Sequence, residues 1–276
     1  DIQKMPKRFI PKPSLKLAQG AMNLKWDVQE IPRWYSNNKC NDGEFIKNSM
    51  SRTYLKRYLE NKGRIFDGTY VSTISKKNKH WEINAVQNRK KKKIYSKNII
   101  LAAGAISTPH ILQKSNISTL AGSKFQMHPT IKVVAQFDDK VNQLGMGVPV
   151  HQVKEFAPSI SMGCSISTKE YLKVAMLDHH IHIKSVDKNW EKMAIFYVMI
   201  KPESHGRIRN IPFFRDPLVT YNLNHNDSLN LANGLKQLCR LLLSAGATHL
   251  YPTIYNAPII RSNNDLDKLP NYLNLS

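Results

Sequence analysis

The sequence predicts a mixed α/β (α+β) protein, and three observations support this fold class. The run Ile99–Ala103 is short, apolar and rich in branched side chains, which favours a buried strand, and a helix signal follows it directly. Three strand-like segments separated by Lys/Asn turns come before this run. Apolar strands joined by short Pro- and Gly-containing turns come after it. This order of strands and helices is typical of sheets covered by helices.

The first part of the chain contains few core-forming residues. Residues 1–44 are rich in Pro, Lys and Asn, so we expect an irregular segment that packs on another part of the protein. A helix is then predicted from Ser49 to about Asn61, and Gly63 is expected to end it. Strands are predicted at Arg64–Ile74, Trp81–Val86 and Ile94–Tyr95, which together form a meander.

The stretch from Lys97 to Ile117 is the centre of the predicted fold. Thr108 is a candidate N-cap, and Pro109 fits the first helical turn, where no N–H needs a partner. A strand, a turn at Gly104 and a helix start would place free backbone N–H groups next to an anionic cofactor. The alternative is an ordinary buried joint between a strand and a helix, because such turns are common.

The second half alternates strands and helices. A strand is expected at Ile131–Phe137 and a helix at Tyr171–His182. Three strands with short connections follow, and a helix capped by Asp227 and ended by Gly246 comes after them. These strands are Met193–Ile200, Gly206–Ile211 and Leu218–Leu223, and the helix spans Ser228–Ser244.

Charge and cysteine content limit the function classes. Lys and Arg outnumber Asp and Glu by 41 to 20, which permits binding to nucleic acid or to an anionic membrane. The lysines are scattered, the dense run Arg89–Lys93 fits a solvated hairpin tip, and no nucleic-acid-binding motif accompanies the charge, so we expect no nucleic-acid partner. No apolar run reaches the ~20 residues of a membrane span. Three dispersed cysteines fit a reducing compartment, and we expect a cytoplasmic protein.

Histidines are the main candidates for site chemistry. His179, His180 and His182 could bind a metal, but no Cys or suitably spaced Glu accompanies them, so we predict no metal site and a partly exposed helix end. His128 could approach a bound ring or be a loop histidine satisfied by backbone. No GxSxG, P-loop or GxGxxG motif is present.

Several blocks resemble one enzyme family. The stretch IILAAGAISTPHILQKSNI resembles the second signature of the glucose-methanol-choline (GMC) oxidoreductases, flavoenzymes that oxidise alcohols. Other blocks are similar to bacterial members in the same order: NSMSRTYL, the Tyr70-Val71 strand, GVPVHQVKEF, HGRIRNIPFFRDPLVTY and NGLKQLCRLLLSAGATHLYPTI. The resemblance spans nearly all of Gly20 to Ser262.

The resemblance implies a domain organisation. It suggests part of an FAD-binding α/β domain at 46–130 and a substrate domain with a large antiparallel sheet and flanking helices at 131–262. Residues 1–45 would be the irregular segment, packed on the substrate domain, and 263–276 a linker that returns to the FAD domain.

The resemblance also implies cofactor contacts. Val71 would contact the adenine of FAD through its backbone, Ala103 and Gly104 would lie beside the dinucleotide, and His128 would lie near the chemical centre without being part of it. A residue without a Cβ at Gly104 agrees with a close approach of backbone to ligand. The substrate would be a small-molecule alcohol.

Two departures from the family pattern limit the expected activity. The GxGxxG segment that should precede these blocks is missing, and the segment with the catalytic His is expected beyond Ser276, so no residue here is assigned as catalytic. We therefore expect an internal portion of an FAD-dependent oxidoreductase acting on CH–OH groups, which a complementary chain could complete. The alternatives are an inactive remnant that serves as an interaction module and, third, a basic nucleic-acid-binding protein.

Overall fold

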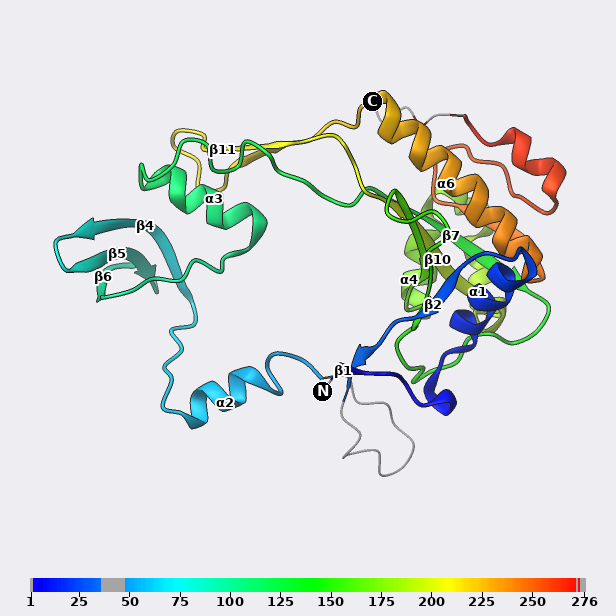
Figure 1. Ribbon diagram of the computed structural model, residues 1–276, viewed down its shortest axis with the longest axis horizontal. Helices are drawn as coiled ribbons and strands as arrows, with labels where there is room; N and C mark the ends of the chain where they lie inside the picture. The colour runs from blue at the N-terminus through cyan, green and yellow to red at the C-terminus, as the bar shows by residue number, and fades with distance from the viewer. Residues whose placement is uncertain (1, 36–47, 272, 274–276) are drawn as a thin grey trace. The chain divides into compact units, whose positions relative to one another are not determined.

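The computed structural model describes residues 2–35, 48–271 and 273, and it contains two compact units (Figure 1). Unit 1 comprises residues 1–55, 128–202 and 225–276, and unit 2 comprises 56–127 and 203–224. The boundary between residues 127 and 128 lies close to the predicted one at 130. The segment 203–224, however, belongs to unit 2, whereas the sequence placed it in the domain 131–262.

Unit 1 is built on a six-stranded, fully antiparallel sheet. Its strand order is β13-β7-β10-β9-β8-β2. The strands are β2 (Val28–Glu30), β7 (Thr130–Phe137), β8 (His151–Val153), β9 (Ile160–Cys164), β10 (Met193–Ile200) and β13 (Ala247–Pro252). The central strand β10 is a continuous apolar run, as expected for a largely covered strand, whereas β7 also carries Thr130, Lys132 and Gln136. The predicted large antiparallel sheet is therefore confirmed.

Two helices, α1 (Lys12–Asn23) and α6 (His225–Ser244), cover one face of this sheet (Figure 1). Helix α6 packs on β10 at Gly234, where an added Cβ would lie 2.7 Å from Val198. The two helices meet at Gly20, whose missing side chain lets α1 approach the backbone of Leu241. The prediction that residues 1–44 are irregular is wrong, because Pro13 opens α1 and its apolar residues are buried.

A second layer, formed by α4 (Lys169–Ala175), α5 (Ile183–Asn189) and two 3-10 helices, covers part of the other face. The 3-10 helices are η4 (Leu177–His182) and η5 (Trp190–Lys192). The apolar residues of this layer form one cluster with the sheet: Val134, Leu172, Ala175, Met176, Val186, Met193, Ile195 and Tyr251. The single helix predicted at Tyr171–His182 is instead broken at His179, whose backbone leaves the helical region.

The buried side-chain amide of Asn142 connects the loop after β7 to the first residue of β10. Asn142 is 5% exposed, and its Nδ2 donates to the carbonyls of Ser167 (2.6 Å), Trp190 (3.3 Å) and Met193 (3.1 Å). The backbone N–H of Asn142 donates to the carbonyl of Glu191. The two N–H hydrogens of one side chain thus serve carbonyls before α4 and at residues 190–193, in keeping with the need of buried polar groups for partners.

Both ends of the described chain belong to unit 1. Near the start, β1 (Ile2–Gln3) pairs with β3 (Arg33–Trp34), and the 3-10 helix η1 (Lys7–Phe9) follows β1. Near the end, the 3-10 helix η6 (Asn263–Lys268) packs on α6. Three leucines of the segment 263–276, predicted to be a linker that returns to the FAD domain, are buried: Leu266, Leu269 and Leu273.

Two buried thiols give a prediction about reactivity. Cys164 and Cys239 are free and buried, and burial raises the pKa of both thiols far above the usual value. We expect iodoacetamide to alkylate them at least about 100-fold more slowly in the folded chain than in urea. Mass spectrometry of a Cys40→Ser variant checks this, because Cys40 lies outside the described residues. Equal rates with and without urea would contradict the burial.

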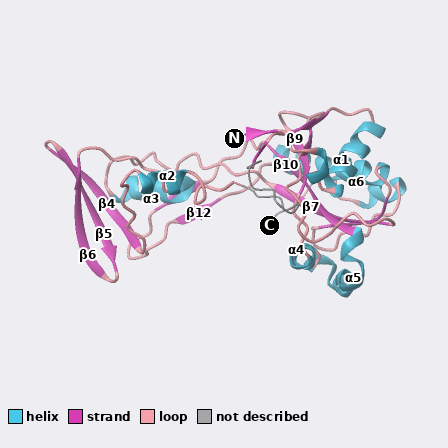
Figure 2. Cartoon of the chain, turned by 90° about the horizontal axis from the view of Figure 1, so that it is seen from below, coloured by secondary structure: helices cyan, strands magenta, loops and turns pink. Residues whose placement is uncertain are grey.

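Unit 2 contains the predicted meander, seen side by side in Figure 2 as β4 (Thr69–Lys77), β5 (His80–Gln87) and β6 (Lys90–Ser96). Asn88 and Arg89, both with positive φ, form the two-residue turn before β6. Most of the lysine run is therefore in the edge strand β6 rather than at the hairpin tip, and charged edge strands resist unwanted pairing. Helix α2 (Tyr54–Glu60) precedes the meander and is shorter than predicted.

Helix α3 (Gly104–Lys114) packs on the meander, and the hairpin of β11 (Arg207–Arg209) and β12 (Leu218–Thr220) packs on α3. The Ser115 hydroxyl accepts the N–H of Ile74, which joins the end of α3 to β4. The antiparallel pairing predicted for β11 and β12 is confirmed, but their expected neighbour β10 lies in the sheet of unit 1.

The buried strand predicted at Ile99–Ala103 is absent. These residues form no strand, and Ile100 is 92% exposed, because no strand in the described part of the chain pairs with them. The helix begins at Gly104, so Pro109 lies inside it and Thr108 is not its N-cap. The Thr108 hydroxyl instead accepts the N–H of Ala103 from within the helix.

Candidate functional site

The predicted cofactor residues fall in both units. Val71, Ala103 and Gly104 lie in unit 2, on elements that pack together, and His128 lies in unit 1. Each unit also contains a surface that sequence reasoning did not identify. These are a pocket beside α3 in unit 2 and an open polar half of the sheet in unit 1.

The turn at Ala103 and Gly104 is open to a ligand. Both residues are exposed, Gly104 has φ +85°, and no atom lies within 4 Å of the position that a Cβ would take. No side chain caps α3, and its first turn holds no acidic residue. The first N–H groups of a helix and its dipole favour an anion, and nothing in the described chain competes for this position.

Val71 lies at an irregularity in β4. It pairs with Ala85, while Thr73 pairs with Asn84, so Ser72 is an extra residue in the ladder. The Ser72 hydroxyl donates to the carbonyl of Asn84. A bulge of this kind turns backbone groups away from the regular ladder, and it occurs here at the residue that the family resemblance singled out.

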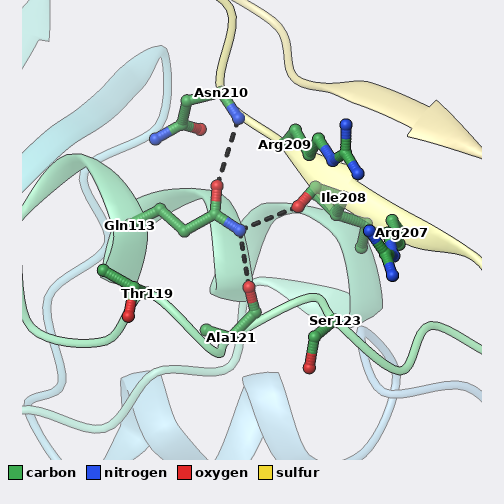
Figure 3. Close-up of a pocket in the computed structure, with 8 residues that line it drawn as sticks. All are labelled: Gln113, Thr119, Ala121, Ser123, Arg207, Ile208, Arg209 and Asn210. Carbon is green, nitrogen blue, oxygen red and sulfur yellow. Dashed lines mark hydrogen bonds between the residues drawn. The ribbon is translucent and has the colours of Figure 1, made fainter.

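A pocket of about 560 Å³ lies between α3, the loop after it and β11 (Figure 3). Gln113 holds the three segments together: its Nε2 donates to the carbonyls of Ala121 (2.5 Å) and Ile208 (2.8 Å), and its Oε1 accepts the N–H of Asn210. Gly122 has φ +85° and contacts Ile208 so closely that a Cβ would meet it at 2.9 Å. The walls of the pocket are therefore fixed by backbone contacts.

Two arginines give this pocket its charge. Arg207 and Arg209 alternate with the buried Ile208, so both side chains extend from one side of β11 (Figure 3). In the residues that the structure describes, neither guanidinium has an ion-pair partner. In the sequence, the alternation Arg207-Ile208-Arg209 after Gly206 is the pattern from which this arrangement could have been predicted.

In unit 1, part of the sheet face beyond α4 and α5 is polar. Tyr197 shares a row with Lys132 on β7 and Gly163 on β9, and Gln152 on β8 pairs with Gly163. The ring of Tyr197 lies over Gly163, where any Cβ would collide with it. Gln152 donates to the Ser161 hydroxyl in the next row. Strand alternation, known only after the register, brings these residues onto one face.

Tyr197 places a phenol hydroxyl on this face. It is half-buried, and no hydrogen bond to its hydroxyl is formed within the described residues. Burial raises the pKa of Tyr197, and the positive charge of Arg33 opposes this shift only in part. The phenol therefore stays protonated and can donate a hydrogen bond to a bound oxygen.

His128 is an exposed residue just before β7. Its carbonyl accepts the hydroxyl of Thr130, and the next carbonyl, that of Pro129, accepts the N–H of Ile200. Among the described residues, no hydrogen bond to the imidazole of His128 is formed. Since β7 begins with the polar residues Thr130 and Lys132, His128 adjoins the polar end of the sheet.

The three neighbouring histidines do not form a metal centre. His179 is buried, against the expectation of an exposed helix end, and its Nε2 donates to the carbonyl of Pro252 at 2.8 Å. His179 and His182 both contact the ring of Tyr251. Across the described residues, no group of three His, Cys, Asp or Glu side chains is placed to hold a metal ion.

The fold and these surfaces define a two-unit α/β protein with an open helix start in one unit and a partly polar antiparallel sheet in the other. Residues 15–130 match the family model of the GMC oxidoreductases. The chain is 26% identical over 257 residues to an uncharacterised GMC-type oxidoreductase of Sinorhizobium fredii, which covers 89% of this chain and 51% of that protein. The chain thus resembles the GMC oxidoreductases, and it spans about half the length of the Sinorhizobium protein.

Two further comparisons agree. A long-chain-alcohol oxidase of Arabidopsis thaliana is 25% identical over 176 residues, which cover 59% of this chain and 22% of that protein. The crystal structure of pyridoxine 4-oxidase from Mesorbium loti has a TM-score of 0.62 at 13% identity and covers 96% of this chain and 57% of that one. The second comparison shows that the fold is shared.

Proposed function

We propose that this chain is part of an FAD-dependent oxidoreductase that oxidises CH–OH groups of a small-molecule alcohol. The observation that carries the proposal is the family match over residues 15–130, which contains the open turn at Gly104. The similarity to a long-chain-alcohol oxidase supports an alcohol as donor. A complementary chain would supply the GxGxxG segment and the catalytic His.

The residues present fit a dinucleotide. We infer that Gly104, Ala103 and the first turn of α3 receive an anionic part of FAD, because this turn is uncapped, exposed and free of acidic side chains. Val71, at the bulge in β4, would contact the adenine through its backbone, and His128 would lie near the reacting atoms. When bound, the flavin supplies the acceptor for the hydride removed from carbon.

The chain's own contribution to chemistry would be to orient the substrate. The protonated hydroxyl of Tyr197 can donate to the alcohol oxygen, and Lys132 adds positive charge on the same face. The apolar cluster under α4 and α5 packs on the adjoining part of this sheet face. We assign no base to this chain. We also expect a cytoplasmic, reducing location, which free Cys164 and Cys239 support.

A pair of glycine variants tests the cofactor site. Gly104 and Gly68 both have positive φ and open space around the missing Cβ, so valine should strain the backbone at either position without a steric clash. We expect Gly104→Val to weaken FAD binding at least about tenfold, and Gly68→Val to leave it unchanged. Quenching of flavin fluorescence measures this in the purified chain and in any longer polypeptide that contains it.

The matched pair separates a local role from general damage. Circular dichroism should show that both variants keep their secondary structure. If FAD binds equally well to Gly104→Val and Gly68→Val, the turn at Gly104 is not part of the cofactor site. If the unsubstituted longer polypeptide binds no flavin at all, the proposed function itself is wrong.

A further inference from the structure

The tip of the β11–β12 hairpin carries two adjacent phenylalanines in solvent. Phe213 is 107% exposed and Phe214 is 64% exposed. All residues from Pro212 to Asp216 are exposed. Single exposed apolar residues are common on protein surfaces, but two consecutive aromatic side chains at the end of a projecting turn form a local apolar protrusion.

The backbone of this tip has an unfavourable conformation at Phe213. The N–H of Phe214 donates to the carbonyl of Ile211, which closes a turn with Pro212 and Phe213 at its centre. Phe213 has φ +69°, at the turn position where glycine is favoured. A bulky residue is a genuine outlier in this region, and such outliers often mark functional positions.

The tip is also held at both ends by one buried histidine of α3. The His110 side chain is 4% exposed, with Nε2 donating to the carbonyl of Arg215 at 3.0 Å and Nδ1 lying 2.5 Å from the Asn210 side-chain amide. Lys114 also donates to the carbonyl of Arg215. Asn210 and Arg215 both contact His110 of α3, so residues 211–214 form a turn between two fixed points.

Positive charge surrounds this apolar tip. Arg207, Arg209 and Arg215 lie on the same hairpin, and Lys114 lies beside its base, whereas Asp216 is the one acidic residue between β11 and β12. The guanidinium of Arg215 lies 4.6 Å from the centre of a tyrosine ring, that of Tyr70. Unit 2 as a whole contains 18 Lys and Arg residues and five Asp and Glu residues.

We propose that the β11–β12 hairpin is a docking element for the surface of an anionic lipid bilayer. Aromatic rings favour the boundary between headgroups and acyl chains, and each Lys or Arg near an anionic surface adds attraction. The Phe213–Phe214 tip would enter this boundary while the arginines contact lipid phosphates. No helix in the described part of the chain is long and apolar enough to cross a membrane.

A bilayer fits this surface better than a nucleic acid. Proteins that stack bases on aromatic rings usually do so in a positively charged groove. Here the two rings are exposed on a turn, and the arginines lie on the strand that leads into it and on the residue that follows it. The inference does not depend on the proposed oxidation of alcohols, because it uses none of the residues assigned to the cofactor.

Vesicle flotation tests the proposal with the purified chain. One set of vesicles contains phosphatidylcholine with 30% phosphatidylserine, and the other contains phosphatidylcholine alone. We expect binding to the anionic vesicles, reduced at least about tenfold by Phe213→Ser/Phe214→Ser and weakened by Arg207→Gln/Arg209→Gln. The matched controls are Tyr255→Ser, which removes an exposed ring in unit 1, and Lys90→Gln/Lys92→Gln, which removes equal charge from β6.

A glycine variant separates membrane contact from folding. Phe213→Gly removes the ring and relieves the positive φ, so its melting temperature should not fall while vesicle binding does. Unchanged vesicle binding by Phe213→Gly and by the double serine variant would overturn the proposal. So would an equal loss in Lys90→Gln/Lys92→Gln, absence of binding to either vesicle, or flotation that is abolished by competing DNA while DNA binding depends on the same phenylalanines.

Discussion

Replacing Asn142 with Asp should be among the most destabilising isosteric changes in this protein. The Nδ2 group of Asn142 faces the carbonyl oxygens of Ser167, Trp190 and Met193 in a buried site. A carboxylate in the same place offers no donor and adds a negative charge beside three carbonyl dipoles. We expect the free energy of unfolding at pH 8 to fall by about 3–5 kcal/mol, measured by urea denaturation.

The pH dependence of Asn142→Asp identifies the cause. Burial and the carbonyls favour the protonated acid, so the pKa of the introduced carboxyl in the folded state should lie above its unfolded value. The folded state then binds more protons than the unfolded state, and stability relative to the natural chain falls as pH rises through that interval. Below the unfolded pKa the penalty is smallest, because the neutral acid can donate one hydrogen bond.

An exposed amide provides the control. Asn23 also donates through Nδ2 to a carbonyl, that of Ser244, at 2.8 Å, but in an exposed position. We expect Asn23→Asp to cost less than about 1 kcal/mol and to show little dependence on pH, because water solvates the charge. Similar losses in the two variants, or a penalty for Asn142→Asp that does not change with pH, would contradict the buried network.

Elements whose signals are local could be predicted from the sequence. The apolar run Met193–Ile200 is a central strand with the predicted bounds, and the leucine spacing of α6 is that of a buried helix face. The predicted end at Gly246 agrees with its φ of +87°. The start of α6 was placed three residues too late, because Asp227 lies within the first turn rather than at the N-cap.

Elements that depend on distant partners could not be predicted in the same way. Helix α1 was hidden by its Pro and Lys content, although Pro13 at the start and the Leu17–Ala21 spacing are helical signals. Conversely, Ile99–Ala103 has the composition of a buried strand but lacks a partner strand in the described chain. Composition gives the preference of a segment, and pairing decides whether a strand forms.

The residues of the candidate site also fall into two groups: those that the sequence could indicate and those that depend on the pairing of distant strands. Family resemblance pointed to Val71, Ala103, Gly104 and His128 as cofactor residues, and these assignments remain predictions that the glycine pair tests. The row of Tyr197 and its neighbours was missed because it depends on the register of β7, β10, β9 and β8. A one-residue change of register would turn these side chains to the opposite face.

A second large effect is expected where α1 crosses α6. A Cβ at Gly20 would lie 2.4 Å from the carbonyl oxygen of Leu241 and 3.1 Å from the Cβ of Ala245. Because the first contact is with backbone, no rotamer change can relieve it, and the helices must separate. We expect Gly20→Val to lower the free energy of unfolding of unit 1 by about 3 kcal/mol or more, as measured by urea denaturation.

The neighbouring position supplies the matched control for Gly20→Val. Gln19 is exposed on the same helix, so Gln19→Val introduces the same β-branched residue without the contact and should cost less than about 1 kcal/mol. Adding Leu241→Ala to Gly20→Val removes a side chain but leaves the carbonyl, so it should not restore stability. Recovery in that double variant would mean that side-chain packing, rather than backbone approach, determines how closely the two helices pack over the sheet.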